Sequence, residues 1–408
     1  MEKIINQAHD KYTFIYALSR LFERASYYGL RSLLVLYMVG ESLKMPTEEA
    51  LSIYGWLTAS IVFSQILGAL LGDLVIGNKK SIIIGGILQA IGAFSFCIPS
   101  TTGLYIGIVL VVLGGGLYTP NMISHFGKLY LNKTKLLDSG FIIFYLAINI
   151  GAFIGTILMG YFGEKLWWNY GFIVAGLLML ISIILLLTSK EIDNTQIIEK
   201  DIHISQKIIE VLTAFILVAL FWAVYEISGM RFFDLEIKFR EISTLNISKS
   251  LWSSLNSVFL IPISIIAIIV WSLFYNTQFI KLTIGFILGA ISYGLLFFIP
   301  ETPSEQHLIL YLVSLLFLSI SEIHIAPIIH SILTQYTNPK YLAIVISLVF
   351  IPTRFFSYIV GIFNDDLYDN PLFSIKLGII IMSVTSIALI TYVFINKKSS
   401  IVQHPSNS

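Results

Sequence analysis

The chain has 408 residues, of which 56% are hydrophobic and only 12% are charged, and its mean hydropathy is +0.85. This composition excludes a water-soluble globular protein and is typical of a chain that crosses a membrane several times. A net charge of +1 gives no reason to expect a nucleic-acid partner. The single cysteine, Cys97, excludes an intramolecular disulfide and a cysteine-based metal site.

Apolar stretches of about 20 residues, long enough to cross a bilayer, recur along the whole chain. The first dozen residues are polar, so no cleaved signal peptide is expected. We predict twelve membrane-spanning helices, at 12–39, 50–76, 81–100, 103–126, 139–162, 168–189, 208–229, 251–275, 281–300, 307–335, 341–362 and 373–395.

The distribution of basic residues predicts the orientation of these helices. An even number of spans places both termini on one side. Lys and Arg are about twice as frequent in the segments that are cytoplasmic when the N-terminus is inside. Four of the basic residues assigned to the outside lie in one predicted loop, 230–250. We therefore expect a multi-pass protein of the cell membrane with both termini in the cytoplasm.

The longest polar cytoplasmic insert, residues 190–207, falls between the sixth and seventh predicted spans. It predicts an N-terminal six-helix bundle at 1–189, a C-terminal bundle at 208–396 and a cytoplasmic tail at 397–408. Two bundles of this kind are typical of transporters that bind substrate between their halves. The turn GALLGDLVIGNKKS, Gly68–Ser81, resembles the loop motif of the major facilitator superfamily. The predicted fold is therefore all-α, integral to the membrane and of the major facilitator type.

The first predicted span carries charges that are costly in hydrocarbon. An Arg in the middle of such a helix costs about 2.5–3.5 kcal/mol, so it normally faces a water-filled cavity or an ion partner. At about 100° per residue, Arg20, Arg24, Tyr27 and Arg31 fall on one helix face, with Glu23 at its edge. The face either lines a cavity or holds a structural ion cluster.

Two motifs resemble those of the proton-dependent oligopeptide transporter family. Glu23–Gly29, with sequence ERASYYG, resembles the latter part of that family's first-helix motif, and Phe144–Gly151, with sequence FYLAINIG, resembles its fifth-helix signature. Further matches occur in both halves of the chain, at Trp222–Glu226, Ser254–Asn256, Glu322 and Ala326–Pro327.

The resemblance implies a division of roles in binding a short zwitterionic peptide. Asn149, Asn256 and Glu322 would receive the amino terminus, while Arg24 and Arg31 would lie toward the carboxylate. The resemblance also implies that Arg31 pairs with Glu226 across the two bundles as an outer gate. Four aromatic residues are expected either to line the cavity or simply to pack: Tyr27, Tyr28, Tyr145 and Trp222.

The chain departs from the family at two positions. The first Glu of the opening motif is Arg20, and the lysine expected in the fourth span is Thr119. The resemblance links those two positions to proton coupling. The acids that remain within the predicted spans are Glu23, Glu226 and Glu322, so one of them would carry any transported proton. Arg354, in the eleventh span, either pairs with Glu322 or adds a positive site for an anion.

The predicted function is import of di- and tripeptides, with protons, by alternating access. The alternatives are an anionic or other non-peptide metabolite as cargo, or proton-independent uniport. We expect no enzyme activity because no catalytic set is visible, and neither a cofactor nor a metal. The expected partners are short peptides, protons and the lipid bilayer, with the protein acting as a monomer.

Overall fold

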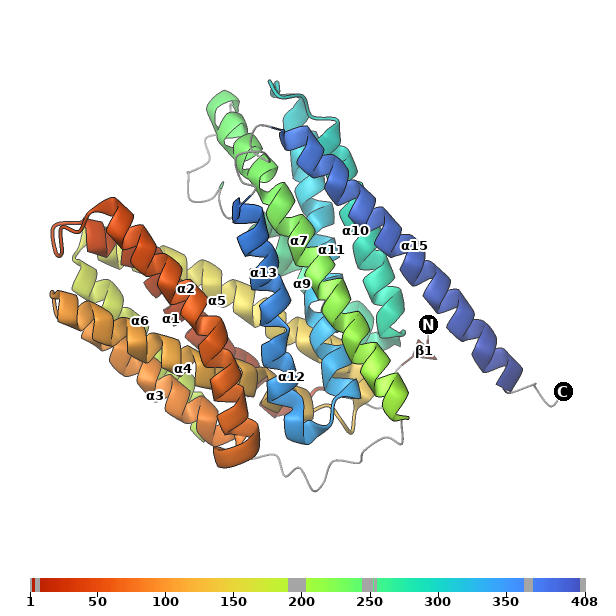
Figure 1. Cartoon of the computed structure of the whole chain (residues 1–408), viewed down its shortest axis with the longest axis horizontal. Helices are drawn as coiled ribbons and strands as arrows, with labels where there is room; N and C mark the ends of the chain where they lie inside the picture. Colours follow the sequence, from red (N-terminus) through yellow and green to blue (C-terminus); the bar gives the residue numbers. More distant parts are fainter. Residues whose placement is uncertain are drawn as a thin grey trace. The chain divides into compact units, whose positions relative to one another are not determined.

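The computed structural model describes residues 2–3, 8–189, 203–243, 252, 255–362 and 370–403. The chain forms two compact units, coloured by sequence in Figure 1. The N-terminal unit comprises Asn6–Ile208 and Leu333–Ile351. The C-terminal unit comprises Met1–Ile5, Ile209–Ile332 and Pro352–Ser408. Because Leu333–Ile351 falls in the N-terminal unit, the division at residues 190–207 is not the only point where the chain passes between units.

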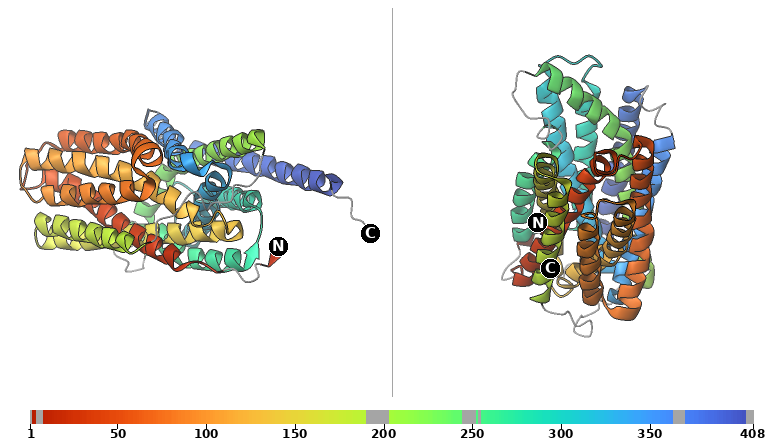
Figure 2. Two further views of the ribbon diagram at one scale, coloured as in Figure 1. Left: turned by 90° about the horizontal axis from the view of Figure 1, so that it is seen from below. Right: turned by 90° about the vertical axis from the view of Figure 1, so that its left-hand side faces the viewer.

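The N-terminal unit is built from helices joined by short turns. Its elements are α1 (Lys11–Val39), α2 (Thr47–Leu71), the π-helical turn η1 (Gly72–Ile76), α3 (Asn78–Ser95), α4 (Thr101–Lys128), the 3-10 turn η2 (Thr134–Leu136), α5 (Leu137–Lys165), α6 (Trp168–Leu187), η4 (Pro339–Tyr341) and α12 (Leu342–Leu348). Helix α1 packs against α5 and α6, and α3 packs against α4, as both Figure 1 and Figure 2 show for the last pair.

Small residues allow α1 and α5 to approach closely. A side chain at Gly155 would meet the backbone of Ala25, and one at Gly29 would meet the carbonyl oxygen of Gly155. Glycine at these positions therefore sets the distance between the two helices, as small residues commonly do in membrane proteins. This close packing holds α1, which carries the charged face, against α5.

The C-terminal unit contains longer helices. They are α7 (Ile204–Ile242), α9 (Leu255–Leu273), α10 (Gln278–Phe297), α11 (His307–Tyr336), α13 (Phe350–Ile362) and α15 (Pro371–Gln403). One end of α7, of α11 and of α13 is assigned to the N-terminal unit. A short antiparallel ladder joins β1 (Glu2–Lys3) to β2 (Phe274–Tyr275), with Glu2 opposite Tyr275.

The predicted spans correspond to helices throughout the described part of the chain. Nine described helices are long and apolar enough to cross a membrane: α2, α4, α5, α6, α7, α9, α10, α11 and α15. The other three predicted spans correspond to α1, α3 and the pair α12–α13. The all-α membrane fold is therefore confirmed. Most of the predicted linker 190–207 lies outside the described residues, and the domain boundaries stay a prediction.

The predicted outer loop 230–250 is wrong in its first half, because α7 continues as a helix to Ile242. Two ion pairs form within this part of α7. The Asp234 carboxylate accepts from Arg231 at 2.7 Å and from Lys238 at 2.9 Å. Arg231 also donates to the backbone carbonyls of Ile299 and Pro300, just beyond the end of α10. These bonds let a basic segment stay helical where the charge count alone suggested a loop.

Candidate functional site

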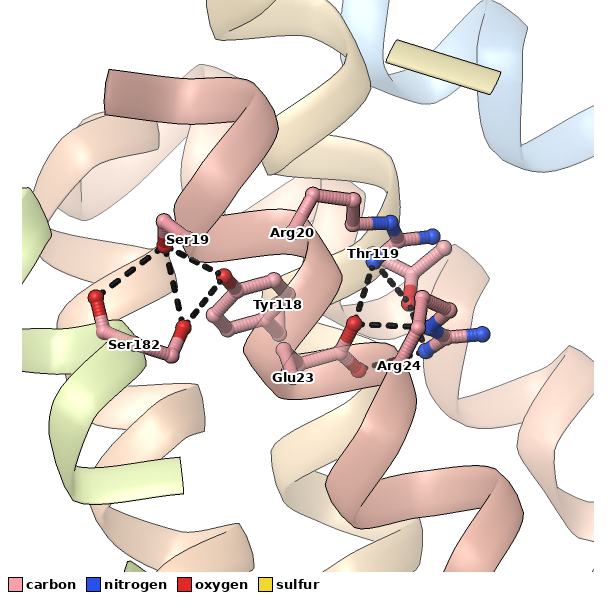
Figure 3. A network of polar contacts seen from close by, with 7 residues as sticks. All are labelled: Ser19, Arg20, Glu23, Arg24, Tyr118, Thr119 and Ser182. Carbon is pink, nitrogen blue, oxygen red and sulfur yellow. Dashed lines mark hydrogen bonds and ion pairs between the residues drawn. The ribbon is translucent and has the colours of Figure 1, made fainter. Parts of the chain in front are cut away.

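A buried ion network lies on the inward face of α1 (Figure 3). The Glu23 carboxylate, fully buried, accepts from Arg20 Nη1 at 2.9 Å and from Arg24 Nε at 2.7 Å. Both arginines also donate to Thr119 Oγ1 on α4, at 3.4 Å each. Two guanidinium groups share one carboxylate, so the network carries a net positive charge when all three are ionised.

The two departures from the family motifs are thus neighbours in space. Arg20 and Thr119 come from different helices yet touch through Nη1 and Oγ1. Beside them, the Tyr118 hydroxyl forms hydrogen bonds with the hydroxyl groups of Ser19 at 3.1 Å and Ser182 at 2.9 Å, as Figure 3 shows. The hydroxyl cluster ties α1, α4 and α6 together next to the charges.

Aromatic rings continue this face of α1. The Arg24 guanidinium carbon lies 4.7 Å from the ring centre of Tyr27 and 5.6 Å from that of Tyr28. Arg31, two turns further along, donates from Nε to the Tyr54 hydroxyl of α2 at 2.9 Å. Both guanidinium groups therefore lie within cation–π distance of aromatic rings. No pattern in the sequence predicts the hydrogen bond from Arg31 to Tyr54.

Asn149 lies half-buried on α5, where its side-chain nitrogen donates to the Tyr145 carbonyl one turn earlier at 3.0 Å. Both residues belong to the N-terminal unit, whereas Asn256 and Glu322 belong to the C-terminal unit. The predicted meeting of Asn149 with Asn256 and Glu322 stays a prediction.

Asn256 and Glu322, predicted to act together, are in contact within the C-terminal unit. Asn256 Nδ2 donates to Glu322 Oε2 at 3.3 Å and to the Tyr225 hydroxyl at 3.4 Å. Ser319 Oγ donates to Asn256 Oδ1 at 2.8 Å. Glu322 is only 4% exposed. Sequence reasoning missed Tyr225 and Ser319, although Tyr225 lies within the motif Trp222–Glu226.

The remaining predicted residues of the C-terminal unit lie on α7. Trp222 is half-buried and packs edge-on against Tyr225, with ring centres 5.1 Å apart. Glu226 is also half-buried, and its pairing with Arg31 of the N-terminal unit stays a prediction. The side chain of Arg354 lies outside the described residues, so its predicted roles also stay predictions.

A second buried polar cluster was not predicted. His324 Nε2 accepts from the Trp271 indole nitrogen at 3.3 Å, while its Nδ1 lies 2.8 Å from the Ile320 carbonyl. The Lys281 ammonium, fully buried, lies 4.7 Å from the Trp271 ring centre. The residues come from α9, α10 and α11 and form no contiguous motif, so only the fold could reveal them.

The turn Gly68–Ser81 is confirmed as a tight, polar connection. Gly77 has a φ of +86°, which favours glycine, and Asp73 accepts from Asn78 Nδ2 and from the backbone N–H of Ile344, each at 2.9 Å. Asn78 Oδ1 accepts from Lys128 at 2.7 Å. The motif therefore joins α2 and α3 to α4 and α12.

Known transporters resemble parts of this chain. An uncharacterized transporter, YclF, of Bacillus subtilis is 34% identical over 184 residues, 43% of this chain and 37% of that protein. The peptide transporter YePEPT of Yersinia enterocolitica is 34% identical over 175 residues, 41% of this chain and 34% of that protein. A di-/tripeptide transporter of Lactococcus lactis is 30% identical over 172 residues, which are 40% of this chain and 35% of that protein. The chain spans about a third of the length of these curated relatives.

Solved structures match nearly the whole chain in fold. A POT family transporter in complex with a thioalcohol-conjugated peptide superposes with a TM-score of 0.63 at 21% identity, covering 97% of this chain and 98% of that one. A POT family transporter in complex with 5-aminolevulinic acid gives a TM-score of 0.60 at 20% identity, covering 95% and 98%. The sequence profile of the Major Facilitator Superfamily matches residues 16–362. The chain therefore belongs to the Major Facilitator Superfamily, whose fold it has.

Proposed function

We propose that this protein imports di- and tripeptides together with protons, by alternating access. The observation that carries the proposal is the contact of half-buried Asn256 with buried Glu322, whose amide and carboxylate lie 3.3 Å apart on α9 and α11. A carboxylate can accept several hydrogen bonds, so Glu322 can accept both from Asn256 Nδ2 and from a primary ammonium. The named relatives, which include peptide transporters of Yersinia enterocolitica and Lactococcus lactis, support the same cargo.

The opposite end of a peptide needs cations, and the N-terminal unit offers them. Arg24 and Arg31 lie on one face of α1 with Tyr27 between them. A peptide backbone of two or three residues extends about 7–11 Å. We propose that its carboxylate meets an arginine while its ammonium meets Glu322. We propose that Asn149 joins the ammonium site and that Tyr28 and Trp222 line the cavity.

The candidates for the proton carrier are the three acids Glu23, Glu226 and Glu322. Glu23 accepts charge-assisted hydrogen bonds from both Arg20 and Arg24. Protonating Glu23 would break two strong bonds at once, which makes it a poor carrier. We assign the proton to Glu226, because its release from Arg31 would open the outer gate, with Glu322 as the other candidate.

A second candidate function is transport of an anionic or other non-peptide metabolite, or uniport without protons. The surplus positive charge of the network around Glu23 favours an anion. The absence of the family acid and base at Arg20 and Thr119 favours uniport. An anionic cargo would bind beside Arg24 and would not need Glu322.

We place the protein in the cell membrane as a monomer, with both termini cytoplasmic. We divide it into bundles at 1–189 and 208–396, joined by the linker 190–207. The excess of Lys and Arg in the segments assigned to the cytoplasm supports this orientation. Labelling of cysteines introduced at residues 10 and 135 in intact cells would test it, because both positions should be protected from an impermeant reagent.

The function is tested by uptake into proteoliposomes. Radiolabelled dialanine and a panel of organic anions are offered with and without an inward pH gradient. We expect dialanine to accumulate above its external concentration only with the gradient. Accumulation of an anion in preference to dialanine would establish the second candidate, and equilibration of dialanine that ignores the gradient would establish uniport.

A further inference from the structure

The C-terminal unit contains a cavity that the proposed roles leave unused. It has a volume of about 230 Å³ and is lined by residues of α7, α9 and α11 together with Trp252. Pockets that enclose a whole small ligand measure roughly 300–1,000 Å³, so this cavity is sized for part of a ligand. Asn256, the partner of Glu322, forms part of its wall. The cavity therefore adjoins the candidate ammonium site at Asn256.

One face of α7 supplies a row of side chains to this cavity. Tyr225, Gly229, Phe232 and Glu236 all line it, and they recur at intervals of four, three and four residues. That spacing places them on a single helix face. Over three turns the row is about 16 Å long, running from the Asn256 contact of Tyr225 to the carboxylate of Glu236.

The chemistry of the wall is aromatic and acidic. Tyr311 and Trp252 are buried, at 3% exposure each, and the rings of Phe232 and Tyr311 have their centres 6.2 Å apart. Of the described residues that line the cavity, Glu236 is the one with a formal charge, and Lys and Arg do not occur among them. Aromatic faces and a carboxylate both attract a cation, while leucines such as Leu315 provide contact for an aliphatic stem.

We propose that this cavity is a side-chain pocket that selects peptides carrying lysine or arginine. The apolar stem of the side chain lies against Leu315, and its charged head meets Glu236 among the rings of Phe232 and Tyr311. The inference rests on the proposed peptide transport and specifies its substrate class. A negatively charged side chain is disfavoured in the same pocket, because it would face the like charge of Glu236.

The test compares two peptides that differ only in charge. Lysyl-alanine and norleucyl-alanine, which share a four-carbon stem, compete with labelled dialanine for uptake into proteoliposomes. In the unmodified protein, lysyl-alanine should inhibit at a roughly 5- to 30-fold lower concentration, the range that a cation beside aromatic rings and a carboxylate supports. Glu236→Gln should reduce that ratio to near one.

Two further variants sharpen the result. Glu241→Gln removes an exposed carboxylate from the same helix, outside the cavity, and should keep both the preference and dialanine uptake. Glu236→Lys should reverse the preference, so that glutamyl-alanine competes better than lysyl-alanine.

Dialanine uptake distinguishes failure of the pocket assignment from failure of peptide transport. If the unmodified protein takes up dialanine but the two peptides compete equally, the pocket assignment is overturned and peptide transport stands. Retention of the preference in Glu236→Gln would overturn the assignment in the same way. If the unmodified protein neither takes up nor binds any peptide, the proposed function fails and the pocket assignment fails with it.

Discussion

The side-chain amide of Asn256 donates to the carboxylate of Glu322 across α9 and α11, and Ser319 fixes the direction of that amide. Ser319 Oγ donates to Asn256 Oδ1 at 2.8 Å, so the amide nitrogen must point toward Glu322. Ser319 lies about one turn before Glu322 on the same helix, which couples the orientation of both side chains to α11. Ser319 is therefore a positioning residue for the proposed ammonium site.

Ser319→Ala should weaken peptide binding without removing it. Losing one orienting hydrogen bond of about 0.5–1.5 kcal/mol corresponds to a rise of roughly 2- to 12-fold in KM, with kcat little changed. Asn256→Ala and Glu322→Gln should have larger effects, because they remove groups that touch the peptide. The measurement is the concentration dependence of dialanine uptake.

Ser314→Ala is the matched control for that variant. Ser314 is a buried serine of the same helix whose hydroxyl contacts Ser292 of α10 rather than Asn256. An equal rise in KM for Ser314→Ala and Ser319→Ala would mean that the effect is general to α11 and would remove the positioning role.

The contact between Arg20 and Thr119 predicts that these positions are coupled in stability. Arg20→Glu places a second carboxylate beside Glu23, and Thr119→Lys adds a third cation to the network. Each single change should destabilise the protein, because it leaves a buried charge without a partner. The double change should recover about 0.5–3 kcal/mol relative to the sum, because the new acid and base face each other. Thermal unfolding of the four proteins in detergent measures the coupling, and purely additive losses would contradict it.

Much of the fold follows from the sequence because hydrophobic length determines where a helix can cross a membrane. The same reasoning identified the charged face of α1, since Arg20, Arg24 and Arg31 repeat at helical spacing. It misplaced the end of α7, because positive charge usually marks a loop, whereas Arg231 here pairs with Asp234 and donates to carbonyls beyond α10.

Contacts between helices were harder to predict than the helices themselves. The pair Asn256–Glu322 was expected only from the family resemblance. The two residues are 66 positions apart in the chain, so no local pattern connects them. The bond from Arg31 to Tyr54 and the cluster of Trp271 with His324 have no motif to announce them. Such contacts depend on the rotation of each helix about its axis, which hydropathy does not fix.

His9 predicts a loss of stability in mild acid. Burial, together with the nearby Lys133 charge, lowers the pKa of His9 below its usual value near 6.5. The unfolded chain therefore binds a proton at this site at a higher pH than the folded protein does. The contribution of His9 is complete above pH 6.5 and is lost as the pH falls from 6.5 through the folded-state pKa.

The contacts of His9 explain which variant tests this dependence. Its Nδ1 lies 2.8 Å from the Tyr130 hydroxyl, and its Nε2 lies 3.3 Å from Ser139 Oγ. His9→Gln keeps a polar side chain that does not titrate, so the Tm should vary less between pH 7.5 and 5.5 than in the unmodified protein. A His203→Gln variant, altered at an exposed histidine, should retain the full dependence. Equal pH dependence in all three proteins would exclude His9 as the source.

Glu226→Gln should separate coupling from transport. The variant retains the size and hydrogen-bonding capacity of the side chain but can no longer gain or lose a proton. If Glu226 carries the proton, accumulation of dialanine driven by a pH gradient should fall at least tenfold, while exchange of labelled for unlabelled dialanine continues. Glu241→Gln, on an exposed position of the same helix, should leave both activities intact. Undiminished accumulation in Glu226→Gln would transfer the role to Glu322, because Glu23 is held by Arg20 and Arg24. Uptake by the unmodified protein that ignores the gradient would instead mean that replacing the family acid and base by Arg20 and Thr119 has left a uniporter.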